Sequence, residues 1–232
     1  MNAKNDTVIL HTRVVRYAHW CWALGVIILI GSGWQIYNQE PLFGFKFPTW
    51  LTIGLGSWEG AERVHNDIGL AGALLWHFAA MWLLFISLIV YVIYGFASGH
   101  FRRHFTPIWP RQILSDITDF LRGRLDHRLG TRNAVQKLLY TGAVLLMILM
   151  VWSGLVLWKP VQFEEIGVPL GDYEGARYIH FFGMTGIVLF IVVHIALTAL
   201  VPKVLPPMIT GKAPRSAVAP EALAPEALEH QS

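Results

Sequence analysis

The chain contains four long stretches without Lys, Arg, Asp or Glu, and they limit its possible folds more than any other feature. They cover residues 17–39, 68–101, 138–158 and 178–202. A helix of roughly 20 apolar residues spans a bilayer, and each stretch reaches that length. Charged residues make up 14% of the 232 residues, against about 25% in an ordinary soluble domain. The sequence therefore predicts an all-α integral membrane bundle of four helices that run up, down, up and down.

Composition divides the chain into three segments. We expect a cytoplasmic N-terminal segment at 1–16, the four-helix domain at 17–212, and a disordered cytoplasmic tail at 213–232, which is rich in Ala, Pro and Glu. The first span could also be a signal peptide, but no small-residue cleavage site follows it, so we interpret it as an uncleaved helix. The second stretch is long for a straight crossing and is expected to tilt, or to leave the membrane near Gly95.

The distribution of basic residues predicts the orientation in the membrane. The segments 1–16, 102–137 and 203–232 carry 14 of the 18 Lys and Arg residues. Basic loops stay on the cytoplasmic side, so both termini are expected there, in a bacterial inner membrane. The net charge of +3 accordingly indicates topology and contact with anionic membrane lipid, not binding of nucleic acid. The two remaining loops are acidic and are expected to face the outside.

Cysteine content excludes several kinds of site within this chain. Cys21 is the single cysteine and lies in the first stretch. A disulfide framework, a cysteine-rich zinc site and an iron–sulfur cluster held by this chain alone are therefore excluded. The absence of a C-x-x-C-H motif also excludes covalently attached haem.

The chain has ten histidines, and half of them lie in or at the ends of the predicted helices. Those five are His19, His65, His77, His180 and His194. The others fall in predicted cytoplasmic segments and are expected to be solvated or interfacial: His11, His100, His104, His127 and His230. An ionisable side chain at membrane depth is costly and marks a functional site. For any one of the five, a histidine packed and hydrogen-bonded between helices is the plainer alternative.

The spacing of His180 and His194 indicates two sites at different depths. Their separation of 14 positions (194 − 180) is nearly four full helical turns, so both rings lie on one face, about 21 Å apart along the axis. That distance is too long for one metal ion, so each ring needs a partner from another helix. Alternating helix directions pair His180 with His65 near the outer face, and His194 with His19 near the cytoplasm. His77 lies deeper, about 120° around the helix from His65, and is expected to have a structural or supporting role.

Paired imidazoles without nearby thiolates or carboxylates favour a haem with two histidine ligands. Zinc sites prefer four ligands, and copper sites usually add a sulfur ligand. Glycines on the same helices would let a flat porphyrin approach the backbone, although simple helix packing also explains them. The candidates are Gly33, Gly69, Gly154 and Gly183. The first and third helices share a Ser-Gly pair beside a Trp, and the second and fourth open with Arg and His, which suggests two repeated hairpins.

Three motifs resemble those of a known family. They are "RYAHW", "RVHNDIG" and "ARYIHFFGMTGIVLFIVVHIAL". They resemble the di-haem cytochrome b subunits of bacterial formate dehydrogenases, nickel–iron hydrogenases and thiosulfate reductases, over about residues 10–212. The resemblance implies two b-type haems in the bundle core, with the ligands His19, His65, His180 and His194.

The same resemblance implies an electron-transfer subunit and not a complete enzyme. Electrons would pass between membrane quinone and a periplasmic catalytic or electron-transfer partner subunit of molybdenum, iron–sulfur or cytochrome type. Arg16, Arg63 and Arg177 are expected to pair with haem propionates, or else to anchor helix ends. The segment "GHFRRHFTPIWPRQ" is expected to form a quinone-pocket wall near His194, or an interfacial anchor.

Three other functions stay open from sequence. A stand-alone superoxide oxidase that reduces quinone would favour a basic outer surface, whereas the outer loops here are acidic. A transporter with a histidine relay would need membrane-embedded carboxylates, and the four stretches contain none. A haem-free membrane anchor would use its histidines for packing only.

Overall fold

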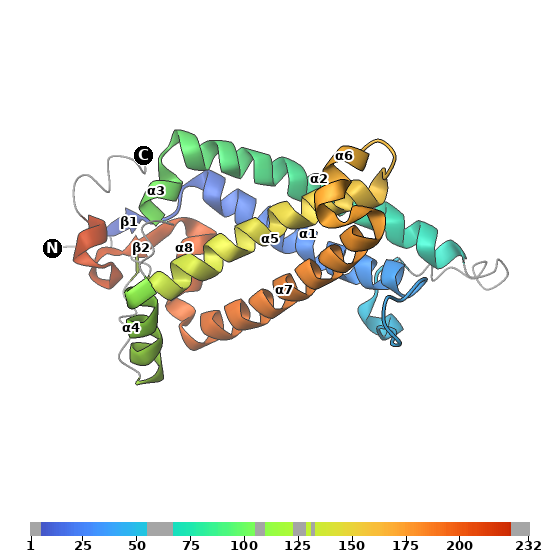
Figure 1. Ribbon diagram of the computed structural model, residues 1–232. Helices are drawn as coiled ribbons and strands as arrows, with labels where there is room; N and C mark the ends of the chain where they lie inside the picture. Colours follow the sequence, from blue (N-terminus) through green and yellow to red (C-terminus); the bar gives the residue numbers. More distant parts are fainter. Residues whose placement is uncertain (1–5, 55–66, 105–109, 123–128, 131–132, 224–232) are drawn as a thin grey trace. The chain divides into compact units, whose positions relative to one another are not determined.

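Four helices of the computed structural model are long and apolar enough to cross a membrane, among the residues that the structure describes (6–54, 67–104, 110–122, 129–130 and 133–223). These helices are α1 (Arg13–Tyr37), α2 (Asp67–Ala97), α5 (Ala134–Trp158) and α7 (Asp172–Leu200), as Figure 1 shows. They coincide with the four uncharged stretches. The prediction of a mostly helical membrane protein is therefore confirmed.

Shorter elements connect and flank these helices. The short α-helices are α3 (His100–His104), α4 (Pro110–Leu121), α6 (Glu164–Gly167) and α8 (Leu205–Thr210). The 3₁₀ turns are η1 (Thr49–Leu51), η3 (Val168–Leu170), η4 (Pro202–Val204), η5 (Arg215–Ala217) and η6 (Pro220–Leu223). Gly99, with φ +66°, follows α2 and ends it in a left-handed conformation that favours glycine. Helix α2 therefore ends at Ala97, two residues beyond Gly95.

The chain forms two compact units, each of which is described separately. Unit 1 contains Met1–Tyr17, Tyr91–Ile148 and Gly186–Ser232. Unit 2 contains Ala18–Val90 and Leu149–Thr185. Each long helix contributes residues to both units.

In unit 1, the two ends of the chain pack together. Strand β1 (Thr7–Ile9) pairs antiparallel with β2 (Lys212–Pro214). Val8, Leu129, Ala213 and Val218 form a buried apolar cluster behind this pair. The structure thus departs from the disordered tail expected from residue 213, because Ala213 and Val218 bury apolar side chains that composition alone did not place. The described part of this segment includes β2, η5 and η6.

In unit 2, small residues let the helices approach closely. Gly25 of α1 lies against the backbone of Ala80 on α2, and Gly183 of α7 lies against the side chain of Met150 on α5. Val156, Leu170 and Ala176 form the buried core where α5, η3 and α7 meet. Many outward side chains of the long helices are apolar and exposed, such as Leu75 at 73%. Such a surface suits a lipid environment.

Candidate functional site

His77 on α2 is held by a serine from α1. The Nδ1 atom of His77 lies 3.0 Å from the Oγ atom of Ser32, whose side chain is fully buried. The next residue, Gly33, places its backbone against the same ring: a Cβ atom there would lie 3.5 Å from Cε1 of His77. One side of the ring is therefore occupied by a Ser-Gly pair, and Nε2 is the nitrogen left to bind another group.

The second hairpin of unit 2 repeats this arrangement. The Nδ1 atom of His180 on α7 lies 2.9 Å from the Oγ atom of Ser153 on α5. A Cβ atom at the neighbouring Gly154 would lie 3.4 Å from Cε1 of His180. Ser153, like Ser32, is fully buried. The repeated Ser-Gly pattern seen in the sequence thus corresponds to two equivalent histidine environments.

These two histidines face each other. The centroids of the His77 and His180 rings are 6.3 Å apart, and the ring planes are inclined by 55°. A metal binds an imidazole nitrogen at about 2 Å, and the ring centroid lies about 1 Å beyond that nitrogen. One metal ion between two Nε2 atoms therefore requires centroids roughly 6 Å apart. The two residues present would therefore fit as histidine ligands of one iron. We call the pair, with Ser32, Gly33, Ser153 and Gly154, the His77–His180 site.

Among the described histidines, His77 is the one whose ring contacts that of His180. The sequence predicts His65 as the partner of His180 and a supporting role for His77. His65 and Arg63 lie outside the described residues, so that pairing stays a prediction. Helix direction and depth alone contain no information on the register between α1 and α2. The Ser-Gly pairs carried that signal.

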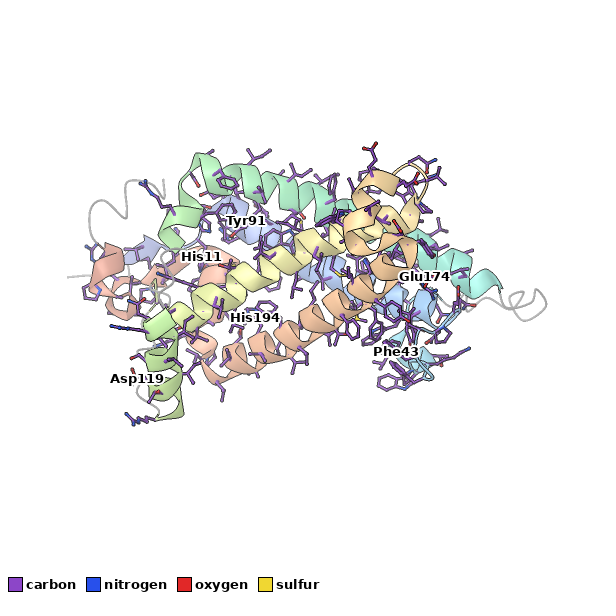
Figure 2. All side chains as sticks on the ribbon, in the orientation of Figure 1. His11, Phe43, Tyr91, Asp119, Glu174 and His194 are labelled. Carbon is purple, nitrogen blue, oxygen red and sulfur yellow. The ribbon has the colours of Figure 1, made fainter. Side chains whose placement is uncertain are left out.

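The other predicted ligands lie in different units. His19, in unit 2, packs edge-on against Trp20 with centroids 5.1 Å apart. His194, in unit 1, lies parallel to the ring of Phe190, 5.6 Å away. Figure 2 labels His194 on α7. Each ring is thus supported by an aromatic neighbour on its own helix, and their pairing stays a prediction.

The predicted arginines bind groups of the protein. Arg177 forms ion pairs with Glu40 and Glu174, both with N···O distances of 3.4 Å. Its Nη2 atom also donates to the carbonyl of Glu40, which joins the end of α7 to the loop after α1. Arg16 donates a hydrogen bond to the carbonyl of Ile209. These contacts fit a role in anchoring helix ends, and they leave the propionate role as a prediction.

The two other predicted glycines are not shown beside a histidine ring. Gly183 packs against Met150, where a Cβ atom would lie 2.8 Å from the sulfur. Gly69 lies within α2, and the structure does not describe its neighbours. Gly33 and Gly154 are thus the two predicted glycines that the structure places beside histidine rings.

The segment proposed as a quinone-pocket wall begins with a buried histidine. His100 is 7% exposed, and its ring packs edge-on against Tyr91 at 5.8 Å. Phe101 contacts Tyr91 and the backbone at Gly95. Residues 105–109 of this segment lie outside the described residues. His100 therefore helps to pack α3 onto the end of α2.

Unit 1 also contains an apolar groove between α5 and α7. Its volume is about 360 Å³. The lining residues include Leu138, Gly142, Leu146, Gly186 and Phe190. Phe190 connects this groove to His194, on which its ring is stacked.

Comparison with known proteins defines the class of protein to which this chain belongs. Residues 10–211 match the family model of the prokaryotic cytochrome b561 proteins. The chain therefore belongs to that family of membrane-bound b-type cytochromes, and membership implies haem b. It is a multi-pass bacterial membrane protein, as its four long apolar helices indicate.

Individual relatives are subunits of oxidoreductase complexes. A protein of Azospira oryzae, provisionally named protein-methionine-sulfoxide reductase subunit YedZ1, is 43% identical over 203 residues, which cover 87% of this chain and 96% of the relative. The cytochrome b556(fdo) subunit of Escherichia coli K12 formate dehydrogenase is 22% identical, over 90% of this chain and 86% of its own length. A Bradyrhizobium diazoefficiens protein, provisionally named as a Ni/Fe-hydrogenase B-type cytochrome subunit, is also 22% identical, over 82% and 76%. These relatives confirm the resemblance found from sequence.

Proposed function

We propose that this chain is a di-haem membrane cytochrome b that passes electrons between membrane quinol and a periplasmic partner subunit. The observation that supports this most directly is the His77–His180 site. Two imidazoles from different helices face each other at 6.3 Å, and each has its Nδ1 atom hydrogen-bonded to a serine. This arrangement suits two axial ligands of one haem.

The proposed ligands of the outer haem are His77 and His180, in place of His65 and His180. For the second haem we retain His19 and His194, from the depth argument on the sequence, with the four helices alternating in direction and both termini in the cytoplasm. A haem held at each site accepts and releases one electron at a time. The chain supplies the ligands, excludes water from the rings and holds the two sites at different depths.

The partner is proposed from the most similar of the reported relatives. That relative is named as a subunit of a protein-methionine-sulfoxide reductase. Reduction of a sulfoxide to a thioether and water consumes two electrons and two protons. Oxidation of one quinol to quinone releases the same number. Electrons would therefore pass from quinol, through the chain, to a periplasmic reductase.

The quinol site is proposed on the cytoplasmic side, near His194. Electrons that leave toward a periplasmic partner must cross the membrane, and a quinol site beside the outer haem would leave the inner haem without a role. The apolar groove of unit 1, whose lining residue Phe190 stacks on His194, would accommodate an apolar chain. A quinone-analogue inhibitor should perturb the haem that depends on His194 and leave the other unchanged. A shift confined to the haem that depends on His77 would contradict this location.

The experiment that tests the ligand assignment is a haem count with single histidine variants. Purified protein should contain close to two haems per chain by pyridine haemochrome assay. His77→Ala and His180→Ala should lose the same spectral component. His65→Ala is the matched comparison, since the sequence predicts His65 as the partner of His180, and it should retain both haems. Loss of a haem in His65→Ala, with both retained in His77→Ala, would restore the original pairing. A protein without haem would refute the proposed function.

A further inference from the structure

We infer that Ser32 and Ser153 are positioning residues that set the tautomer of His77 and His180 and thereby tune the potential of the haem between them. This inference rests on the proposed function, because it concerns the ligands of the outer haem. It goes further in assigning a matched role to two buried serines that bind no cofactor themselves.

The proton positions follow from the hydrogen-bonding capacity of each serine. The Oγ atom of Ser32 lies 2.6 Å from the carbonyl oxygen of Ile28 and 3.0 Å from Nδ1 of His77. A carbonyl oxygen only accepts hydrogen bonds, so the hydroxyl proton must point toward Ile28. The hydroxyl then accepts from His77, and the ring proton lies on Nδ1.

The same reasoning applies in the second hairpin. The Oγ atom of Ser153 lies 2.8 Å from the carbonyl oxygen of Leu149 and 2.9 Å from Nδ1 of His180. The backbone carbonyls of Leu29 and Met150 are also near these serines, at 3.3 and 3.4 Å from Oγ. Each hydroxyl proton is therefore directed to a carbonyl of its own helix, and each Oγ atom accepts from Nδ1 of its histidine.

A proton on Nδ1 leaves the lone pair of Nε2 free to bind iron. Ligating histidines commonly donate their other N–H group, which fixes the ring orientation and raises ligand basicity. A more basic ligand favours the ferric over the ferrous state and so lowers the reduction potential. Both rings donate to neutral hydroxyls in matching geometry. The two histidines should therefore affect the reduction potential to a similar extent. Removing either serine should therefore raise the potential of this haem.

A merely structural serine would behave differently, and Ser87 offers a matched control. Its Oγ atom lies 2.6 Å from the carbonyl of Leu83, the same back-bond within a helix of unit 2. Its described hydrogen bonds go only to backbone carbonyls. Ser87→Ala thus removes a hydroxyl and its back-bond without altering a histidine ligand.

The test uses the full-length, haem-loaded protein in redox titrations. Ser32→Ala and Ser153→Ala should each raise the midpoint potential of the component that depends on His77 and leave the other unchanged. Ser32→Thr, which keeps a hydroxyl, should restore the wild-type value, and Ser87→Ala should change neither haem. If an alanine variant does not accumulate, Ser32→Cys, whose thiol accepts weakly, should show the same upward shift. Unchanged potentials in the variants would overturn the inference.

A second readout separates this inference from the proposed function. In dithionite-reduced protein, ¹⁵N-histidine NMR should show the proton of His77 and His180 on Nδ1, and its signal should move in the two alanine variants. A proton on Nε2 in the wild-type protein would overturn the inference even if both haems were present. If the protein contained no haem, the pyridine assay would reveal it, while the NMR signal would still report the tautomer.

Discussion

At the scale of single residues, the His77–His180 site depends on small neighbours as much as on its ligands. Gly33 and Gly154 place bare backbone against the two rings. A Cβ atom at Gly33 would lie 3.5 Å from Cε1 of His77, and one at Gly154 would lie 3.4 Å from Cε1 of His180. An alanine there would reach ordinary van der Waals contact. A branched side chain would occupy the space of the ring or of the porphyrin beside it, because packed interiors tolerate added volume poorly.

We predict that Gly33→Val and Gly154→Val will each diminish the haem that depends on His77. The added methyl groups must displace the histidine ring from its facing position. Optical redox titration of the purified variants measures the loss of that component. Gly44→Val is the control, since a Cβ atom at Gly44 meets no atom within 4 Å. Full haem content and unchanged potentials in both site variants would contradict this packing role.

At the scale of elements, the loop between α1 and α2 is joined to α1 by a buried asparagine. The side chain of Asn38 donates to the carbonyl of Phe47 at 2.9 Å and accepts from its amide at 2.8 Å. Phe47 also stacks on Trp34, with centroids 4.7 Å apart. Asn38 is 8% exposed, so these bonds replace water that the backbone of Phe47 would otherwise bind. The aromatic side chains of this loop, including the labelled Phe43, are visible in Figure 2.

We predict that Asn38→Ala will destabilise the protein by about 1–3 kcal/mol, the usual cost of leaving buried polar groups unsatisfied. Thermal unfolding, monitored by haem absorbance, should show a lower midpoint temperature for this variant. Gln39→Ala changes the adjacent, exposed side chain and should leave the midpoint unchanged. Equal midpoints for Asn38→Ala and the wild type would show that the loop does not depend on these bonds.

Within the described part of the same loop, Gly54 makes a close contact with α2. Gly54 has φ +106° and lies against the backbone of Gly72 and Ala73 on α2, where a Cβ atom would overlap. An L-residue is strained in this conformation, and the overlap adds to the strain.

Gly54→Ala is therefore expected to lower thermal stability by more than about 1 kcal/mol. Gly44→Ala, in the same loop, should have little effect because a Cβ atom there meets open space. Thermal unfolding of the two variants, measured in parallel, tests this difference in stability. A Gly54→Ala variant as stable as Gly44→Ala would refute the contact.

At the scale of the whole molecule, the distribution of charge predicts the orientation in the membrane. Three segments carry 14 of the 18 Lys and Arg residues, whereas the two intervening loops carry 4 basic residues and 8 of the 15 acidic ones. We predict that a reporter fused after the C-terminal residue will be active only if it is of a type that works in the cytoplasm. Fusions in the loop near Lys46 should be active only as periplasmic reporters. The opposite pattern would reverse the proposed direction of electron crossing.

Electron delivery provides a test of the partner. We predict that a reduced quinol analogue will reduce both haems in membranes, and that methionine sulfoxide will reoxidise them only when a periplasmic reductase subunit is present. The His77→Ala variant should block reoxidation, because the outer haem is proposed to be the exit site. Stopped-flow absorbance measures both phases. Reoxidation without the partner, by oxygen or superoxide chemistry alone, would favour a stand-alone oxidase.

The sequence by itself determined the properties that depend on local composition. Span length and hydrophobicity predicted all four long helices, because a bilayer imposes a minimum apolar length on any helix that crosses it. The sequence also allowed the family to be recognised, because the motifs around His19, His180 and His194 are contiguous. The ordered residues 213–223 were missed, because their burial depends on β1, at the other end of the chain.

Only the tertiary structure placed the ring of His77 beside that of His180. His77 lies on α2, and no periodicity within that helix distinguishes a ligand from a packed ring. The choice depends on the register between helices: Ser32 meets His77 across 45 positions, and Ser153 meets His180 across 27. That register is set by close backbone contacts, such as Gly25 against Ala80, which become visible only once the helices are packed.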